Sequence, residues 1–265
     1  MPRSNRSTHS TLWPSLAVLA ATAMLLALFG CGSDEKKNPL DPGGGVTPST
    51  SFTGSLTSGT VSGTLGITVS STSLARGIRG AAATVVTASG TLKIVGGGTI
   101  SLTGSYDTVL DTLYLTGGGY LIRGTYYPSD VPPTFNGTWV GPGGSGFWGC
   151  IVGDASTVKV FCGTFSATSG GYGKLNMVVY ADTAVVGLAQ SFDSDIPLFF
   201  DGTVSRNETS PGIKTITLGG IDDLGAVMTA TGELTVATNM ATGTWEIMMD
   251  TTPVDDGTWE AQLTP

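Results

Sequence analysis

The sequence predicts an all-β protein, an antiparallel meander that closes into a soluble barrel or sandwich. Three observations predict this fold: apolar residues recur with a period of two, glycine-rich turns come at short intervals, and no stretch of helical length carries a sustained apolar stripe. Successive side chains of a strand point to opposite faces of the sheet, so a half-buried strand alternates apolar and polar residues. We expect about 14 to 16 strands after residue 50.

The clearest alternation lies in residues 60–70. One parity holds apolar residues and a glycine: Val61, Gly63, Leu65, Ile67 and Val69. The other parity holds mainly hydroxyl residues, and the same pattern recurs in residues 86–94 and 100–106. We therefore expect apolar side chains to face the interior and hydroxyls to face solvent.

Glycine marks both the turns and the strands. Turn sequences such as Gly96-Gly97-Gly98 and Gly141-Pro142-Gly143-Gly144 predict hairpins rather than crossover helices. A triplet of glycine, a hydroxyl residue and an apolar residue also recurs along the chain, as in Gly137-Thr138-Trp139. An inward glycine leaves room for a large neighbour and lets the sheet bend, as barrel closure requires.

An internal repeat predicts two tandem halves, 51–145 and 146–265. Three pairs of segments are similar: Thr99–Gly104 with Thr215–Gly220, Gly124–Tyr126 with Gly243–Trp245, and Gly137–Trp139 with Gly257–Trp259. Two closures stay open at this point. Each half forms a small sandwich or barrel of its own, or both halves contribute strands to one larger barrel.

Residues 1–30 have the pattern of a signal peptide. Basic residues precede an uncharged apolar run over 16–29, which is too short to span a bilayer as a permanent helix. Leu28-Phe29-Gly30-Cys31 then resembles the lipobox of bacterial lipoproteins. The resemblance implies that Cys31 becomes an acylated mature N-terminus carrying a diacylglycerol, and that the protein is held at the cell envelope. Gly32 in the next position favours the outer membrane.

The segment after this cysteine predicts a flexible acylated linker over 31–50, because it is polar, rich in glycine and proline, and without apolar periodicity. The all-β domain then covers 51–265. His9, the only histidine, lies in the predicted signal peptide. A mature chain without imidazole excludes Ser-His-Asp and Cys-His catalysis and histidine-bound zinc. A net charge of −8 argues against nucleic acid as a partner.

Cys150 and Cys162 flank two strand-like runs around a turn at Gly153-Asp154. One antiparallel register places the two cysteines directly opposite each other, within the distance that a disulfide bridges. The cell envelope is oxidising enough to keep such a bond. The sequence therefore predicts a structural disulfide between them.

Acidic residues are the remaining route to catalysis. They gather in three loops: Asp193, Asp195 and Asp201; Asp222 and Asp223; and Asp255, Asp256 and Glu260. Paired carboxylates serve glycoside hydrolysis or hold calcium, but aspartate is also an ordinary turn residue. Turn chemistry already accounts for these positions, so we expect no catalytic residue, no metal site and no cofactor. The weak calcium candidates are Asp193, Asp195, Asp255 and Asp256.

Aromatic residues lie mostly beside turns. We expect Trp139, Trp245 and Trp259 in the core, because they share one triplet context. Tyr127, Trp148 and Tyr172 are the candidates for exposed ligand-binding residues, which stack on sugars or hold an apolar molecule.

Taken together, these patterns predict a lipid-anchored, non-catalytic binding or surface-interaction module. The expected partners are the membrane, through the N-terminal lipid, and a glycan or apolar small molecule. Two alternatives stay open: a carboxylate-dependent glycan hydrolase of the envelope, and a purely structural envelope component. Two carboxylates facing each other in a cleft, about 5 to 10 Å apart, favour the hydrolase.

Overall fold

The structure is a computed structural model that describes residues 49–70, 85–193, 197–221 and 225–264. These residues contain sixteen antiparallel β-strands and no helix, which confirms the all-β prediction. Within them, no helix therefore has the length and apolar character that crossing a membrane demands. The predicted signal peptide, Cys31 and the linker up to residue 48 lie outside the described residues.

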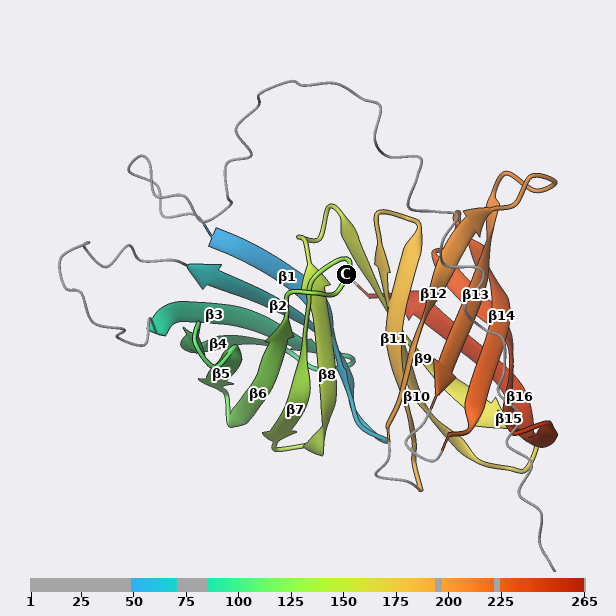
Figure 1. Ribbon diagram of the computed structural model, residues 1–265, viewed down its shortest axis with the longest axis horizontal. Coiled ribbons are helices and arrows are strands. Elements are labelled where there is room, and N and C mark those ends of the chain that lie inside the picture. Colours follow the sequence, from blue (N-terminus) through green and yellow to red (C-terminus); the bar gives the residue numbers. More distant parts are fainter. Residues whose placement is uncertain (1–48, 71–84, 194–196, 222–224, 265) are drawn as a thin grey trace, which may run out of the picture. The chain divides into compact units, whose positions relative to one another are not determined.

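The first eight strands form one closed barrel (Figure 1). They are β1 (Ser49–Thr57), β2 (Ser62–Ser70), β3 (Val85–Ile94), β4 (Thr99–Asp107), β5 (Thr112–Gly117), β6 (Tyr120–Tyr127), β7 (Thr134–Gly141) and β8 (Gly144–Val152). Each strand pairs with the next along the chain, and β8 pairs with β1 to close the ring. We call this barrel A.

The last eight strands form a second closed barrel, barrel B. They are β9 (Val158–Ala167), β10 (Tyr172–Tyr180), β11 (Ala184–Ser191), β12 (Pro197–Arg206), β13 (Ile213–Ile221), β14 (Val227–Thr235), β15 (Met240–Met249) and β16 (Thr252–Leu263). Here β16 pairs with β9. The sequence left two closures open, and the structure has the first of them: each half closes on itself. The boundary falls between Val152 and Val158, later than residue 145, and β1 takes in two residues assigned to the linker.

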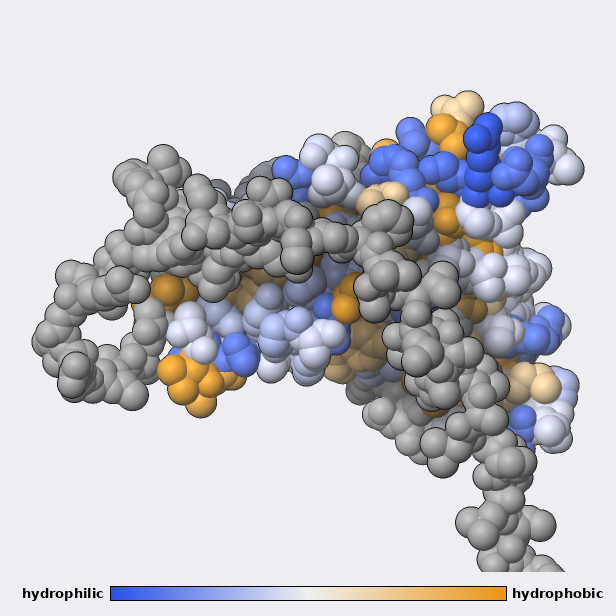
Figure 2. Space-filling model, turned by 45° about the horizontal axis from the view of Figure 1, so that its top comes forward, coloured by the Kyte–Doolittle hydropathy of each residue, from blue (hydrophilic) through white to orange (hydrophobic). Residues whose placement is uncertain are grey.

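The predicted alternation of faces is confirmed in both barrels. In β3, Val86 and Ala88 are buried while Thr87 and Ser89 are exposed, because only one face of the strand meets the barrel interior. Each barrel encloses its own apolar core. On the face seen in Figure 2, hydrophilic and weakly polar residues cover most of the coloured surface, and hydrophobic residues appear in separate places.

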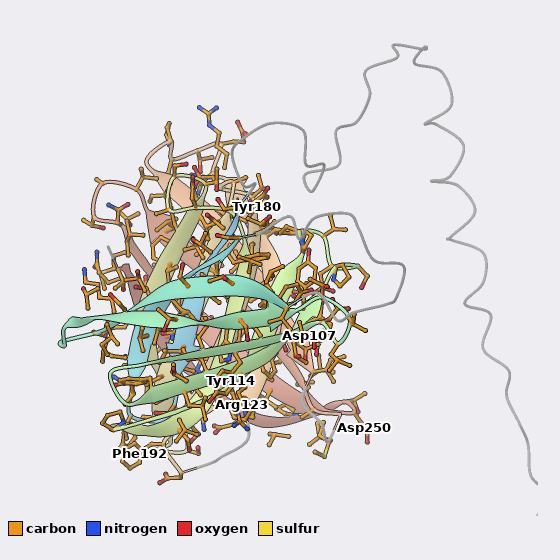
Figure 3. All side chains as sticks on the ribbon, turned by 90° about the vertical axis from the view of Figure 1, so that its left-hand side faces the viewer. Asp107, Tyr114, Arg123, Tyr180, Phe192 and Asp250 are labelled. Carbon is orange, nitrogen blue, oxygen red and sulfur yellow. The ribbon has the colours of Figure 1, made fainter. Side chains whose placement is uncertain are left out.

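Outer-face side chains also interact across the ladder. Tyr114 of β5 and Arg123 of β6 are cross-strand neighbours, and the guanidinium carbon lies 5.4 Å from the centre of the tyrosine ring (Figure 3). A cation over an aromatic face is attracted by the ring quadrupole. This pair therefore helps to hold β5 against β6.

Both barrels place a tryptophan of the last strand over two glycines. In barrel A, Trp148 lies over the cross-strand pair Gly124–Gly137, and its indole N–H donates to the carbonyl oxygen of Thr138 at 3.1 Å. The absence of a Cβ at Gly124 gives the indole its space, and the absence of one at Gly137 lets the two strands approach closely. Trp148 is fully buried in the core of barrel A.

Trp259 repeats this arrangement in barrel B. It lies over the cross-strand pair Gly232–Gly243 and donates to Thr244 at 3.2 Å. The tandem repeat is thus confirmed, but its alignment differs from the one read in the sequence. The similar sequence segments match β6 with β15 and β7 with β16. The Trp–Gly–Gly arrangement instead makes β6 equivalent to β14 and β7 equivalent to β15.

The two barrels contact each other within one compact unit. Outer faces of β1 and β8 meet those of β9, β10 and β11. Asn176 is fully buried there: its Nδ2 donates to the carbonyl oxygen of Leu56 at 2.7 Å, and its Oδ1 accepts from Ser62 at 3.2 Å. Ile151, Val158 and Val178 form a small apolar cluster in the same region.

The expected disulfide between Cys150 and Cys162 is wrong, because both are free, buried thiols. β8 pairs with β1 and β7, and β9 pairs with β10 and β16, so the two runs belong to different barrels rather than to one hairpin. Cys150 faces the core of barrel A, where its Sγ donates to the carbonyl oxygen of Leu65 at 3.5 Å. Cys162 alternates with the inward-facing Phe161 and points out of barrel B.

Candidate functional site

The aromatic ligand candidates divide into two exposed residues and one buried residue. Tyr127, at the end of β6, is 40% exposed, and Tyr172, at the start of β10, is 54% exposed. Trp148 is 0% exposed, so its expected exposure is wrong. Trp148 packs inside the barrel beside Gly124 and Gly137, which lie on other strands. Residues adjacent to Trp148 in the sequence do not reveal this packing.

The tryptophans expected in the core lie as predicted, with one difference. Trp139 and Trp259 are buried. Trp245 is half-buried and packs against the core of barrel B from one end. Its ring meets Phe165 edge to face, with centroids 5.9 Å apart, and its indole N–H donates to Thr258 at 3.3 Å.

Asp255 and Asp256 lie in β16 rather than in a loop, and both have hydrogen-bond partners in the β9–β10 turn. The hydroxyl of Ser169 donates to Asp255 at 2.7 Å, and that of Thr168 donates to Asp256 at 3.1 Å. The Ser169 bond lowers the pKa of Asp255, because it favours the charged carboxylate. These bonds tie the β9–β10 turn to β16.

No group of three or more potential metal ligands occurs in the described part of the chain. Asp193 is exposed, and its backbone N–H donates to the hydroxyl of Ser191 at 3.3 Å. Asp195, Asp222 and Asp223 lie outside the described residues. Of the described calcium candidates, Asp193 lies in the turn after β11, whereas Asp255 and Asp256 are neighbours in β16.

Aromatic side chains fill the interior of barrel A. Phe135 meets Phe52 edge to face at 4.7 Å between ring centres, Tyr106 at 5.5 Å, and lies beside Tyr126 at 4.9 Å. The Tyr106 hydroxyl donates to Asp111 at 2.6 Å. Burial, reinforced by this bond to a carboxylate, raises the pKa of Tyr106 well above its usual range. These rings therefore pack against one another in the core of barrel A.

Barrel B keeps an apolar cavity of about 120 Å³ at the end marked by Trp245. Phe165, Leu198 and Trp245 are among its walls, and Ser191 supplies the one polar side chain in the lining. The cavity follows from side-chain size. Counted from the glycine under each tryptophan, Ala230 of β14 holds the position that Ile122 holds in β6. The smaller residue leaves space in barrel B that the isoleucine fills in barrel A.

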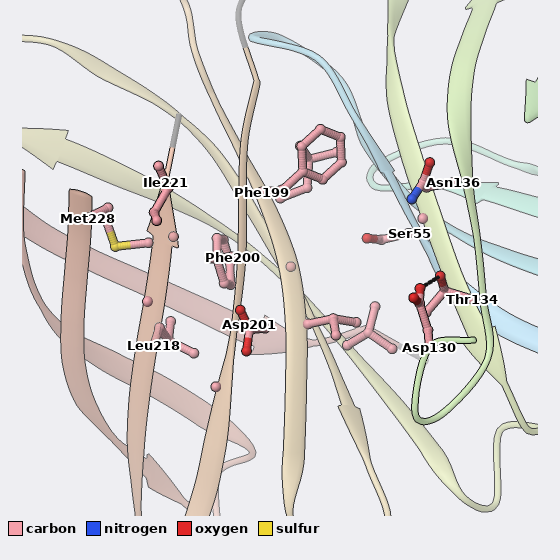
Figure 4. A pocket seen from close by; sticks show the side chains of 18 of the residues that line it. Ser55, Asp130, Thr134, Asn136, Phe199, Phe200, Asp201, Leu218, Ile221 and Met228 are labelled. Carbon is pink, nitrogen blue, oxygen red and sulfur yellow. Dashed lines mark hydrogen bonds between the residues drawn. The ribbon is translucent and has the colours of Figure 1, made fainter. Parts of the chain in front are cut away.

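A larger cleft, of about 910 Å³, has lining residues from both barrels. Figure 4 shows Asp130, Thr134 and Asn136 on one side and Phe199 and Asp201 on the other. Asp130 accepts a hydrogen bond from the Thr134 hydroxyl. Phe199 also meets Phe147 edge to face, with centroids 6.2 Å apart.

This cleft brings one predicted acidic residue together with one that sequence reasoning missed. Asp201 stood among the candidates, but Asp130 did not. Asp130 lies in the β6–β7 connection just before Pro132 and Pro133, where aspartate is an ordinary turn residue. Only the tertiary structure places both carboxylates on one cleft.

Comparisons with protein-family models, curated proteins and solved structures find no match to this chain. Its function therefore has to be derived from its own geometry. Two features stand out: an apolar cavity inside barrel B, and a cleft with two carboxylates.

Proposed function

We propose that this protein is a lipid-anchored binding module of the cell envelope, and that barrel B takes up a small apolar ligand. The observation that carries the proposal is the apolar cavity in barrel B, which lies against the core of that barrel. An eight-stranded barrel is just wide enough to be filled by side chains or to hold one small ligand. The cavity makes barrel B a barrel of the second kind.

The size and lining of the cavity define the chemical class of the ligand. Its 120 Å³ compares with an engineered apolar cavity of about 150 Å³ that stays dry and binds benzene. The buried part of the ligand is then a compact apolar group, such as an aromatic ring or the end of an alkyl chain. Ser191 offers a hydroxyl to a polar end of the ligand.

Ala230→Leu tests this proposal by filling the cavity. We expect benzene or octanoate to raise the melting temperature of the wild-type protein, and Ala230→Leu to abolish that rise. A ligand at about one hundred times its Kd stabilises the folded state by about 2.7 kcal/mol. Thr231→Val, on the outer face of the same strand, is the control and should keep the shift. Equal shifts in wild type and Ala230→Leu would refute binding in the cavity.

The membrane anchor rests on Leu28-Phe29-Gly30-Cys31 and on the apolar run before it. Cys31→Ser should lose metabolic labelling with radioactive palmitate, because the serine hydroxyl does not form the thioether. A single acyl chain holds a protein only marginally, so stable anchoring needs the further chains that the lipoprotein motif implies. Equal labelling of wild type and variant would contradict the anchor.

The second candidate function is the carboxylate-dependent glycan hydrolase. The observation that favours it is that Asp130 and Asp201 line the same cleft. General acid–base catalysis contributes about 10²- to 10⁴-fold, so Asp130→Asn and Asp201→Asn should each lower the release of reducing ends from peptidoglycan by that order. Asp193→Asn, on an exposed turn, is the control. Undiminished release in both cleft variants would exclude this role.

A further inference from the structure

A third hollow, of about 960 Å³, lies on the outer face of barrel B. Its lining comes from β9, β10, β15 and β16, and the β1–β2 turn of barrel A adds Gly59 and Thr60 at the edge. The proposed apolar site lies inside barrel B, whereas this groove lies on the opposite face of the same strands. The two sites therefore have different openings, although Phe165 contributes to the lining of both.

Two rows of polar side chains cross the floor of the groove. Successive cross-strand neighbours make up each row: Lys174, Thr164, Glu260 and Thr242 in one, and Tyr172, Ser166, Thr258 and Thr244 in the other. The hydroxyls of Ser166 and Thr258 are hydrogen-bonded at 3.0 Å. Neighbouring strands lie about 4.8 Å apart, so each row presents polar groups at that spacing.

A pair of exposed aromatic rings stands at one end of the second row. Tyr172 and Phe192 are about half exposed, and their rings stack with centroids 5.3 Å apart and planes 22° from parallel. The backbone N–H of Phe192 donates to the carbonyl oxygen of Tyr172 at 2.9 Å. Figure 3 shows Phe192 at the margin of the molecule.

Gly59 lets the neighbouring turn approach this pair. A Cβ at Gly59 would lie 2.9 Å from the Cα of Phe192 and 3.0 Å from the carbonyl oxygen of Ser191. The glycine thus allows the β1–β2 turn to pack on the backbone that carries Phe192. This packing supports the backbone of Phe192, while the two rings remain about half exposed.

We infer that this groove binds a neutral glycan, with Tyr172 and Phe192 as the stacking platform. A sugar ring presents an apolar C–H face and an edge of hydroxyls, so its site needs an aromatic surface beside hydrogen-bonding groups. Lys174 and Glu260 flank Thr164 with opposite charges, so the floor favours neither an anion nor a cation. An apolar ligand would bury the hydroxyls without partners, at a cost that a glycan avoids.

The test measures binding of neutral oligosaccharides to the full chain in detergent. The probes are cellohexaose, chitohexaose and maltohexaose, and the measurement is isothermal titration calorimetry. We expect at least one probe to bind, and the double variant Tyr172→Ala, Phe192→Ala to weaken that binding at least tenfold. Tyr127→Ala is the matched control, because this exposed tyrosine lies outside the groove and should leave the affinity unchanged.

Thr258→Val provides a second variant that keeps the shape of the side chain and removes its hydroxyl. It should weaken the same probe severalfold while the melting temperature of the protein stays unchanged. Ala230→Leu should leave glycan affinity unaltered, which separates this inference from the apolar site. Failure of all three probes to bind, or equal affinity in wild type and the double aromatic variant, would overturn the glycan site.

Discussion

At the scale of single residues, glycine decides where the largest side chains lie. A Cβ at Gly124 would fall 2.3 Å from the Cζ2 atom of Trp148 and 2.4 Å from the carbonyl oxygen of Asn136. A Cβ at Gly66, also inside a strand, would meet nothing beyond its chain neighbours closer than the carbonyl oxygen of Thr91 at 4.0 Å. Two glycines inside strands thus have unrelated roles, because only Gly124 lies under an indole.

The variants Gly124→Ala and Gly66→Ala should therefore differ in stability. Gly124→Ala overpacks the core of barrel A and should lower the free energy of unfolding by about 1–3 kcal/mol. Gly66→Ala meets open space and should be neutral, or stabilising by about 0.5 kcal/mol, because alanine has less freedom in the unfolded chain. Urea denaturation measures both. Similar losses in the two variants would contradict this account.

The two buried thiols should be unreactive until the protein unfolds. Burial raises the pKa of the Cys150 and Cys162 thiols, so the reactive thiolate is scarce in the folded state. In a Cys31→Ser chain, Ellman's reagent should react slowly with the native protein. In urea without reductant it should react rapidly with both cysteines. Absence of reaction in urea would show that a disulfide forms after all.

At the scale of elements, tight turns align the strands and carry the charged contacts. In the β10–β11 turn, Ala181 and Asp182 adopt left-handed backbone conformations with φ of 48° and 58°. Asp182 accepts a hydrogen bond from the ammonium of Lys159 on β9 at 2.9 Å and lies 3.3 Å from that of Lys214 on β13. Asp182 thereby connects the β10–β11 turn to β9 and to β13.

The contacts of Asp182 should make a pH-dependent contribution to the free energy of unfolding. The Lys159 hydrogen bond holds the pKa of Asp182 below its ordinary value, despite partial burial. The stabilisation is therefore present above the unfolded-state pKa and is lost as pH falls through the lower folded-state pKa. Asp182→Asn should reduce stability at about pH 7 by well under 1 kcal/mol, since the pair is exposed, and should have no effect at about pH 2.

Asp250→Asn is the matched control for the ion pair. Asp250 also has a left-handed backbone, with φ of 56°, in the β15–β16 turn, but the ion pairs among the described residues do not include it. Asparagine tolerates this conformation as aspartate does, so the backbone is unchanged in both variants. A pH-dependent loss of equal size in the control would contradict an ionic origin.

At the scale of the whole molecule, the contact between barrels uses outer faces that elsewhere meet solvent. β10 and β11 carry apolar residues on both parities, and the outward Val178 and Leu188 are buried. Asn176 is the polar centre of this contact, with bonds to Leu56 and Ser62 of barrel A. Apolar residues on both parities are typical of a strand buried on both faces.

Asn176→Leu should weaken the contact between barrels. It leaves the carbonyl of Leu56 and the hydroxyl of Ser62 buried without these partners, so we expect a loss of about 1–3 kcal/mol in the free energy of unfolding. Gln262→Leu removes an exposed amide that donates to Thr238 at 2.9 Å, and should change stability by no more than about 0.5 kcal/mol. Equal effects, measured by urea denaturation, would contradict a central role for Asn176.

Much of the fold was predictable because its signals are local. The parity of residues such as Val86 and Ala88 follows from the alternation of one strand, and the turns follow from glycine and aspartate. The burial of Trp148 and the separation of Cys150 from Cys162 were not predictable in this way. Each depends on which distant strand becomes the neighbour. The apolar run over β10 and β11 was the one available signal for the contact between barrels.

The sequence by itself determined that the chain forms short antiparallel strands with an apolar interior and a hydroxyl-rich exterior. The alternation of side chains and the residue preferences of turns act over a few residues, so both can be recognised without the tertiary structure. Only the tertiary structure decided that β8 returns to β1 and β16 to β9, and hence that there are two barrels. Closure depends on pairing between strands far apart in the chain and on the summed volume of the side chains enclosed. The same sum leaves an apolar cavity in barrel B.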